Sequence, residues 1–246
     1  MNKYRADLHI HTVLSPCGSL DMSPVKIIDK AREKGLDIIG ITDHNSTRHC
    51  KLISKLAEVA GIFVLMGAEV TTREEVHCLS FFENDDQLSE FQTYLELHLP
   101  PIPNNTGKFG YQVVVDEDEQ IIDEIEFLLI SALDQSIDQV EQKVHLLGGI
   151  FIPAHIDRPS YSITSQLGFI PADLLIDGIE ISANCKTEFI LPFIGKRKDL
   201  AIIRSSDAHY EDQIGKVFTT FEMEHRSFTE IRFALHGLQG RKVSIS

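Results

Sequence analysis

The chain has 246 residues, a length that suits one large domain. It carries 23 basic and 37 acidic residues, and its formal charge of −14 argues against whole-surface attraction to nucleic acid or anionic membranes. Hydrophobic residues make up 43% of the chain, as in globular proteins, and no apolar run approaches the roughly 18–20 residues that cross a bilayer. Composition therefore excludes collagen, coiled-coil, secreted miniprotein and membrane classes.

The N-terminus has no apolar signal region, so we expect a cytoplasmic protein. Four cysteines are scattered without a CxxC pair, and in a cytosolic chain of this size they are expected to be free thiols. No Gly-rich phosphate loop or nucleophilic serine elbow is present, so neither a nucleotide cofactor nor serine hydrolysis is supported. The sequence carries no signal of oligomeric state.

The predicted elements begin with Asp7–Thr12, which alternates polar and apolar residues as a strand does. A helix over 25–34 follows, with Ser23 and Pro24 at its start and Gly35 at its end. The remaining runs alternate, in the order strand 38–41, helix 48–60, strand 62–66, a strand ending near 82, helix 137–147, and strands 150–154, 176–182 and 201–204. This alternation predicts βα units, a mostly parallel sheet and an α/β fold.

Net charge is concentrated between residues 83 and 145. This segment holds fifteen Asp and Glu against two Lys and no Arg, whereas the rest of the chain is almost neutral. It includes a loop-like stretch over 100–107 and an acidic run over 116–126. We interpret it as an insertion in a single barrel domain spanning 1–246. It is either a solvated acidic face or a lid that shapes the substrate pocket.

Histidines and acids gather at the ends of the predicted strands. His9 and His11 lie on one side of the first strand, with Asp7 beside them. The other strand-end residues are Asp43, His44, Glu69, His77, His155, Asp207 and His209. Strand C-termini of a parallel barrel meet at one end, so these residues are expected to converge. Imidazoles with carboxylates suit Zn, Mn or Fe, and Glu69 is the natural bridge between two ions.

These motifs resemble the polymerase-and-histidinol-phosphatase (PHP) family of phosphoesterases. The resemblance rests on Asp-Leu-His-Ile-His-Thr at 7–12, Thr-Asp-His-Asn at 42–45, Gly-Ala-Glu at 67–69 and Ser-Asp-Ala-His at 206–209. It covers essentially the whole chain except the acidic segment. It implies a distorted (β/α)7 TIM-like barrel with two or three divalent metal ions at the strand C-termini.

The resemblance also implies a set of ligands for each ion. The first ion is assigned His9, His11, Glu69 and Asp207. The second shares Glu69 and adds His77 and His155. The third is assigned His44, His209 and Cys17, which occupies a loop position where the family often has His or Asp; Cys17 is either a ligand or a small loop residue. Asp7 and Asp43 are expected to support the ligands from behind, although Asp43 could also ligate directly.

The implied activity is metal-dependent hydrolysis of phosphoester bonds, in which a metal-activated water attacks phosphorus. We expect a small phosphorylated substrate such as a nucleotide, with no long nucleic acid and no membrane partner, because the acidic segment would repel long polyanions. Arg158 either grips a phosphate or pairs with Asp157 or another acid. Arg48, Asn184 and Lys186 are further substrate-binding candidates, and the general acid is unassigned.

Two other functions remain open. The same metal site could hydrolyse amides, as other metal-dependent barrel hydrolases do, although Arg158 favours phosphate. Alternatively, the chain could be a non-catalytic metal-binding regulatory module. A complete two-metal ligand set argues against that alternative.

Overall fold

The computed structural model describes residues 1–195, 197 and 200–245. The helices are α1 (Pro24–Glu33), α2 (Cys50–Val59), α3 (Asp85–His98), α4 (Thr106–Phe109), α5 (Ile137–Leu146), α6 (Ile163–Leu167), α7 (Thr187–Ile194) and α8 (Phe228–Leu235). The strands are β1 (Asn2–Ile10), β2 (Ile38–Ile41), β3 (Phe63–Thr71), β4 (His77–Phe82), β5 (Val113–Val115), β6 (Ile121–Glu124), β7 (Ile150–Pro153), β8 (Ile179–Ile181), β9 (Ile202–Arg204), β10 (Thr219–Met223) and β11 (Lys242–Ile245). Single 3-10 turns form over Glu211–Gln213 and Leu238–Gly240.

The main sheet has the strand order β11-β10-β1-β2-β3-β4-β7. β1, β2 and β3 are parallel, but β4 is antiparallel to both β3 and β7, and β10 is antiparallel to β1. The prediction of a mostly parallel sheet is therefore corrected to a mixed sheet. Only residues 72–76 join β3 to β4, and a parallel crossover needs a dozen residues or more.

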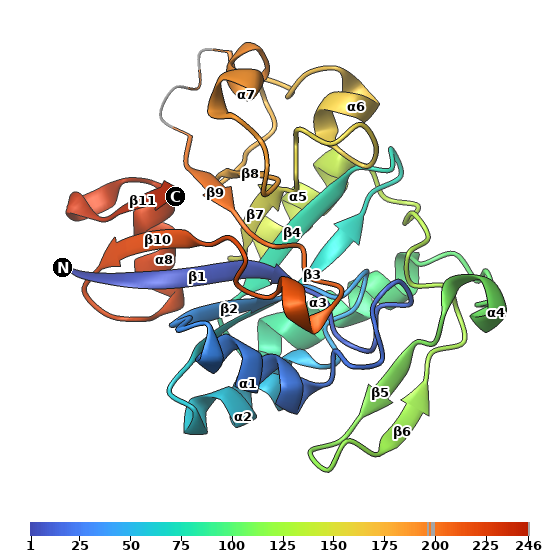
Figure 1. Ribbon diagram of the computed structural model, residues 1–246. Helices are drawn as coiled ribbons and strands as arrows, with labels where there is room; N and C mark the ends of the chain where they lie inside the picture. The colour runs from blue at the N-terminus through green and yellow to red at the C-terminus, as the bar shows by residue number, and fades with distance from the viewer. Residues whose placement is uncertain (196, 198–199, 246) are drawn as a thin grey trace.

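β8 and β9 form a separate parallel pair that continues the curl of the main sheet. The Ile156 N–H, just after β7, donates to the Glu180 carbonyl of β8, and the Ala208 N–H, after β9, donates to the His9 carbonyl of β1. Figure 1 shows these strands wrapped into a curled half-barrel. The expected α/β class and TIM-like curl are confirmed, while the structure shows no continuous ring of seven parallel strands among the residues it describes.

Two apolar layers hold the sheet in place. One lies between the strands and the helices and includes Ile27 of α1, Ile53 of α2 and Ile39 of β2. The other includes Leu8 of β1 and Leu79 of β4. No helix in the described part of the chain combines the length and the apolarity that crossing a bilayer requires.

The acidic segment is not confirmed as one insertion. Both of its ends belong to the body of the domain, because α3 buries Leu88 and Phe91 and α5 buries Val140 and Val144 in the main core. Only the middle, residues 100–132, lies outside the main core, and we call it the arm. Figure 1 shows its β5–β6 hairpin extending from the body.

The arm packs against the loop that follows β1. Val113 and Val115 of β5 are buried against Val13, and Val114 packs with Leu14. Close approach also occurs at Gly110, where a Cβ atom would lie 2.2 Å from the Pro16 carbonyl oxygen. Gly110 has φ +97°, a conformation that L side chains rarely adopt. The arm therefore supports the loop that carries Cys17.

We predict that Gly110→Ala lowers the free energy of unfolding by about 1–3 kcal/mol, because it adds both backbone strain and a clash with Pro16. Denaturant unfolding of the purified protein measures this change. Gly107→Ala is the matched control in the same arm, since its Cβ would meet only the Asn105 side chain at 3.4 Å. Equal stability of the two variants would contradict the proposed packing.

Candidate metal centre

The structure brings the nine residues predicted as ligands to one end of the curled sheet. His9 and His11 come from the end of β1, and Glu69 comes from β3. His77 belongs to the start of β4 because β4 runs antiparallel, which places it beside the ends of its neighbours. The others lie in loops: Cys17 after β1, His44 after β2, His155 after β7, and Asp207 and His209 after β9.

Four of these side chains form a tight buried set: His9, His11, Glu69 and Asp207. Their facing nitrogen and oxygen atoms lie 3.2–3.4 Å apart, including 3.2 Å between His9 Nε2 and His11 Nε2. Atoms bound about 2.1 Å from a common ion lie about 3.0–3.4 Å from one another in octahedral or tetrahedral geometry. The donor set therefore fits one divalent cation, as the first predicted ligand set requires.

Glu69 extends the site to a second group of imidazoles. Its Oε1 lies 2.8 Å from His77 Nδ1 and 3.1 Å from His155 Nε2, and its Oε2 lies 3.0 Å from His44 Nδ1. The contact with His44 lacks hydrogen-bond geometry, so this nitrogen is buried with no hydrogen-bond partner in the described structure. A carboxylate between so many nitrogen donors suits a bridge between two ions.

His44 also belongs to a third group with His11 and His209. The His11 and His209 rings are stacked with centroids 4.1 Å apart. Desolvation raises the pKa of the Cys17 thiol, but hydrogen bonds with His209 and His44 outweigh it and lower this pKa to about 6. Cys17 thus lies beside two imidazoles of this group, and its low pKa favours the thiolate.

The buried charges hold each other in place. Burial opposes ionisation of Glu69, yet His77, His9 and His44 keep the pKa of this carboxyl well below its usual range. Burial likewise opposes the charge on His9, whose pKa is nevertheless raised well above its ordinary value by Glu180 and Asp207. The site holds more imidazoles than carboxylates. Bound divalent cations would neutralise the carboxylates without requiring protonated imidazoles, which would repel one another.

A second layer of hydrogen bonds orients the ligands. Asp43 accepts hydrogen bonds from the Thr12 N–H and the Ser15 hydroxyl, each at 2.7 Å, and Ser15 Oγ lies 3.0 Å from His11 Nδ1. Asp7 instead accepts from the N–H groups of Ser206 and Gly215, which anchors the loop before Asp207. Both acids occupy supporting positions, and burial raises the pKa of Asp7 to about 6.

Sequence reasoning missed the role of Glu180. Its buried Oε2 lies 3.0 Å from His9 Nδ1 and accepts a hydrogen bond from the His155 N–H at 3.0 Å. One carboxylate thus orients two predicted ligands and leaves His9 Nε2 facing the donor set. Its position at the end of the 176–182 run was the only available signal.

Backbone strain is concentrated around the site. Non-glycine residues with positive φ include His155 at 29°, Asp207 at 51°, Asn45 at 45° next to His44, and Tyr161 at 57°. Such conformations cost about 1–3 kcal/mol each and persist where the surrounding structure fixes them. The strained backbone therefore lowers the stability of the fold while it fixes the orientation of these side chains.

Arg158 is the cation that the structure places at the cluster. Its Nη1 lies 2.6 Å from Asp207 Oδ2, and its side chain remains 42% exposed. The partner is thus an acid of the cluster and not the neighbouring Asp157, which accepts hydrogen bonds from Ser182. An exposed guanidinium beside a ligand carboxylate can also reach a substrate phosphate.

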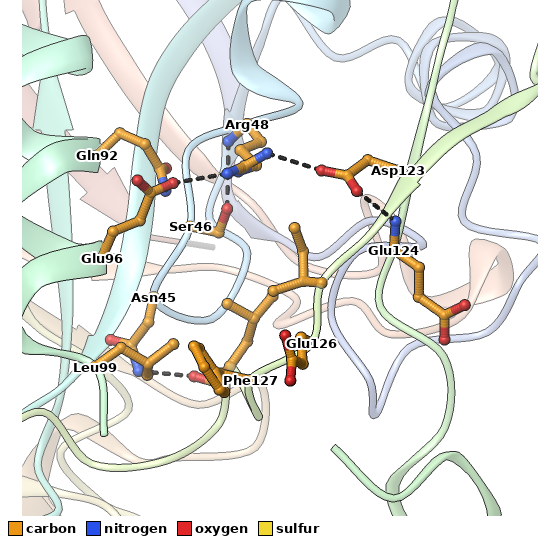
Figure 2. A pocket seen from close by; sticks show the side chains of 12 residues that line it. Asn45, Ser46, Arg48, Gln92, Glu96, Leu99, Asp123, Glu124, Glu126 and Phe127 are labelled. Carbon is orange, nitrogen blue, oxygen red and sulfur yellow. Dashed lines mark hydrogen bonds and ion pairs between the residues drawn. The ribbon is translucent and has the colours of Figure 1, made fainter. Parts of the chain in front are cut away.

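The other predicted substrate contacts lie elsewhere. Arg48 lies 2.8 Å from Glu96 and 3.1 Å from Asp123, in a cavity of about 340 Å³ lined by α3 and the arm. Figure 2 shows its side chain between these two acids. Asn184 and Lys186 line a separate surface hollow. Arg48 is thus engaged in structural ion pairs. The structure does not bring Arg48, Asn184 or Lys186 into contact with the predicted metal ligands.

Comparison with known proteins gives two family matches and several relatives. The model described as PHP domain matches residues 7–165, and the one described as PHP-associated matches residues 193–237. The uncharacterized protein YqxK of Bacillus subtilis is 24% identical over 99% of this chain and 64% of its own length. The chain thus spans less than two thirds of that relative.

Solved structures share the fold at low identity. The lesion-specific endonuclease Endonuclease Q from Pyrococcus furiosus aligns with TM-score 0.73 and 21% identity, over 98% of this chain and 58% of that protein. Endonuclease Q in complex with a 27-mer duplex containing an abasic lesion aligns equally, with TM-score 0.74. An amidohydrolase from Chromobacterium violaceum aligns with TM-score 0.60 and 18% identity, over 93% and 96% of the two chains.

The similarity to a protein that holds duplex DNA at its active site corrects one prediction. We expected a small phosphorylated substrate and no long nucleic acid, and this comparison overturns that expectation. The inference failed because it assumed that the acidic segment would lie where it repels a long polyanion. The acidity is concentrated in residues 83–145, and net charge does not describe the face that carries the metal centre.

We predict that Glu180→Gln weakens binding of the first metal ion about 10-fold, because the neutral amide orients His9 less strongly than the carboxylate does. Calorimetric titration of the metal-free protein with Zn²⁺ or Mn²⁺ measures the affinity. Glu188→Gln, at an exposed position on α7, is the control and should bind as the parent does. Unchanged affinity in Glu180→Gln would remove Glu180 from the site.

Cys17→Ser should lower the occupancy of a third ion while leaving two ions bound, because a serine hydroxyl is a much weaker ligand than a thiolate. Elemental analysis of protein purified without chelators gives the stoichiometry. Cys185→Ser is the control. The same metal content in all three proteins would exclude Cys17 as a ligand.

Proposed function

The chain belongs to the PHP domain family of metal-dependent hydrolases, and we propose that it cleaves phosphodiester bonds in nucleic acid. The observation that carries this proposal is the buried donor set around Glu69, together with Arg158 at its edge. Similarity to a lesion-specific endonuclease supports nucleic acid as the substrate class.

His9, His11, Glu69 and Asp207 would hold one ion, and Glu69, His77 and His155 a second. His44, His209 and Cys17 would hold a third. Bound divalent ions supply a water of lowered pKa and neutralise phosphoryl oxygens. Phosphoryl transfer otherwise depends mainly on positioning and charge stabilisation.

The chain's own residues supply that positioning. Arg158 turns from Asp207 toward a nonbridging phosphate oxygen, which places positive charge where the transferring group gains negative charge. With an ion bound, Glu180 would hold the proton on His9 Nδ1, so that His9 Nε2 could offer its lone pair to the ion. Ser15 and Asp43 act on His11 in the same way.

Amide hydrolysis is the second candidate, since an amidohydrolase shares the fold. The pairing of Arg158 with Asp207 favours phosphate, because a neutral amide offers a guanidinium no charge to neutralise. A test of both uses metal-loaded protein, a duplex oligonucleotide with one abasic site, an undamaged duplex, bis-p-nitrophenyl phosphate and p-nitroanilide amides. Chelator-sensitive cleavage of a phosphodiester supports the proposal, whereas cleavage of amides alone overturns it.

We expect Arg158→Ala to lower kcat/KM for phosphodiesters about 10- to 100-fold, which corresponds to losing one charged hydrogen bond of about 1.5–3 kcal/mol. Steady-state kinetics on metal-loaded protein measures the change, and metal content should stay constant. The control is Arg73→Ala, an exposed arginine paired only with Glu74 at 3.7 Å among the ion pairs of the described chain. Equal kinetics in the two variants would exclude a role for Arg158.

A further inference from the structure

The loop after β7 carries an aromatic ring to the rim of the metal centre. The ring of Tyr161 is stacked on that of His77, with centroids 4.8 Å apart and an interplanar angle of 21°. His77 in turn contacts Glu69 through Nδ1. Tyr161 therefore lies one side chain away from the carboxylate at the middle of the cluster.

Tyr161 is not packed as a core residue. It is 46% exposed, although one face of its ring is covered by His77. Because His77 covers one face of the ring, a second ring could stack only on the opposite face. A flat aromatic surface at the mouth of a metal centre is thus open to stacking by a second ring.

The backbone fixes this ring in place. Tyr161 has φ +57°, which an L residue adopts only at a cost, and its carbonyl accepts a hydrogen bond from the His77 N–H at 2.9 Å. Next to it, the Ser162 hydroxyl donates to the Arg158 carbonyl at 2.7 Å. At the start of the loop, Asp157 accepts a hydrogen bond from the Ser182 N–H. Hydrogen bonds before and after Tyr161 therefore hold its backbone in the strained conformation.

The same loop also presents Arg158, whose guanidinium contacts Asp207 on the other side of the cluster. Within four residues the chain thus offers a cation suited to a phosphate and an aromatic face suited to a base. In a nucleic acid strand these two groups occur together in every nucleotide. Stacking of an unpaired base on an aromatic side chain tolerates any sequence, because every base has a π-face.

We propose that Tyr161 forms a stacking subsite for an unpaired nucleobase adjacent to the phosphate that is cleaved. This subsite rests on the proposed phosphodiesterase function and assigns it a substrate class, a single-stranded or locally unstacked nucleic acid strand. It also accounts for the strained backbone at Tyr161, because this conformation keeps the ring at the surface, where a base can stack on it.

The test compares two oligonucleotides of equal length, one with ordinary deoxyadenosines and one with tetrahydrofuran abasic residues throughout. Tyr161→Ala should raise KM about 10-fold for the strand with bases and change KM for the abasic strand less than 2-fold. Tyr161→Phe keeps the ring and should behave as the parent does. Tyr111→Ala, an exposed tyrosine on the arm, is the control and should change neither KM.

Other outcomes separate the two proposals. An equal loss on both strands, or loss of bound metal in Tyr161→Ala, would show that the ring only supports His77, and no loss on either strand would exclude the subsite. If the parent protein cleaves neither strand, KM cannot be compared, and the phosphodiesterase proposal fails only if none of the phosphodiesters named above is cleaved either. The subsite is then tested by equilibrium binding of the same two strands to metal-loaded protein, measured by fluorescence anisotropy. The proposal is supported if Tyr161→Ala weakens binding of the strand with bases and leaves binding of the abasic strand unchanged. Equal affinities of the parent and Tyr161→Ala for the strand with bases would overturn it.

Discussion

The buried carboxylate of Glu69 is the interaction on which the architecture depends. It is only 1% exposed, and five imidazoles lie within 3.4 Å of its oxygens. A carboxylate without water is strongly unfavourable unless positive or hydrogen-bonding groups surround it. Those groups come from β1, β4 and the loops after β2 and β7, so these elements must all meet at the same level of the curled sheet.

The arm is connected to this centre by a continuous set of hydrogen bonds. The Val115 N–H donates to His49 Nε2 at 3.0 Å, and His49 Nδ1 lies 2.6 Å from the Thr12 hydroxyl. Thr12 donates to Asp43, which also receives the Ser15 hydroxyl beside His11. Burial lowers the pKa of His49, which favours the neutral ring that can both donate and accept. His49 is thus a structural link between the arm and the loop after β1.

This connection bears on the two interpretations of the acidic segment. The outer strand β6 is exposed along its whole length and keeps its acids in water, as a solvated face does. The inner strand β5 is buried and packs its valines against the loop after β1. The arm therefore keeps the acids of its outer strand in water while its apolar side braces the first loop.

The sequence by itself predicted which imidazoles and carboxylates come together at one end of the sheet. This was possible because imidazole and carboxylate chemistry is local, and because short apolar runs mark where strands stop. The helix near 25–34 followed from equally local signals, namely an N-cap at one end and a glycine at the other.

Only the tertiary structure decided the direction of β4, the extent of the arm, and the partners of Glu180, Arg158 and Tyr161. Glu180 meets His9 across 171 positions of sequence, and Arg158 meets Asp207 across the curl of the sheet. Such pairs depend on how the strands close on one another, which local periodicity does not encode. A strand-end acid or a loop tyrosine has the same local pattern whether it faces solvent or a metal centre, and the fold alone distinguishes the two.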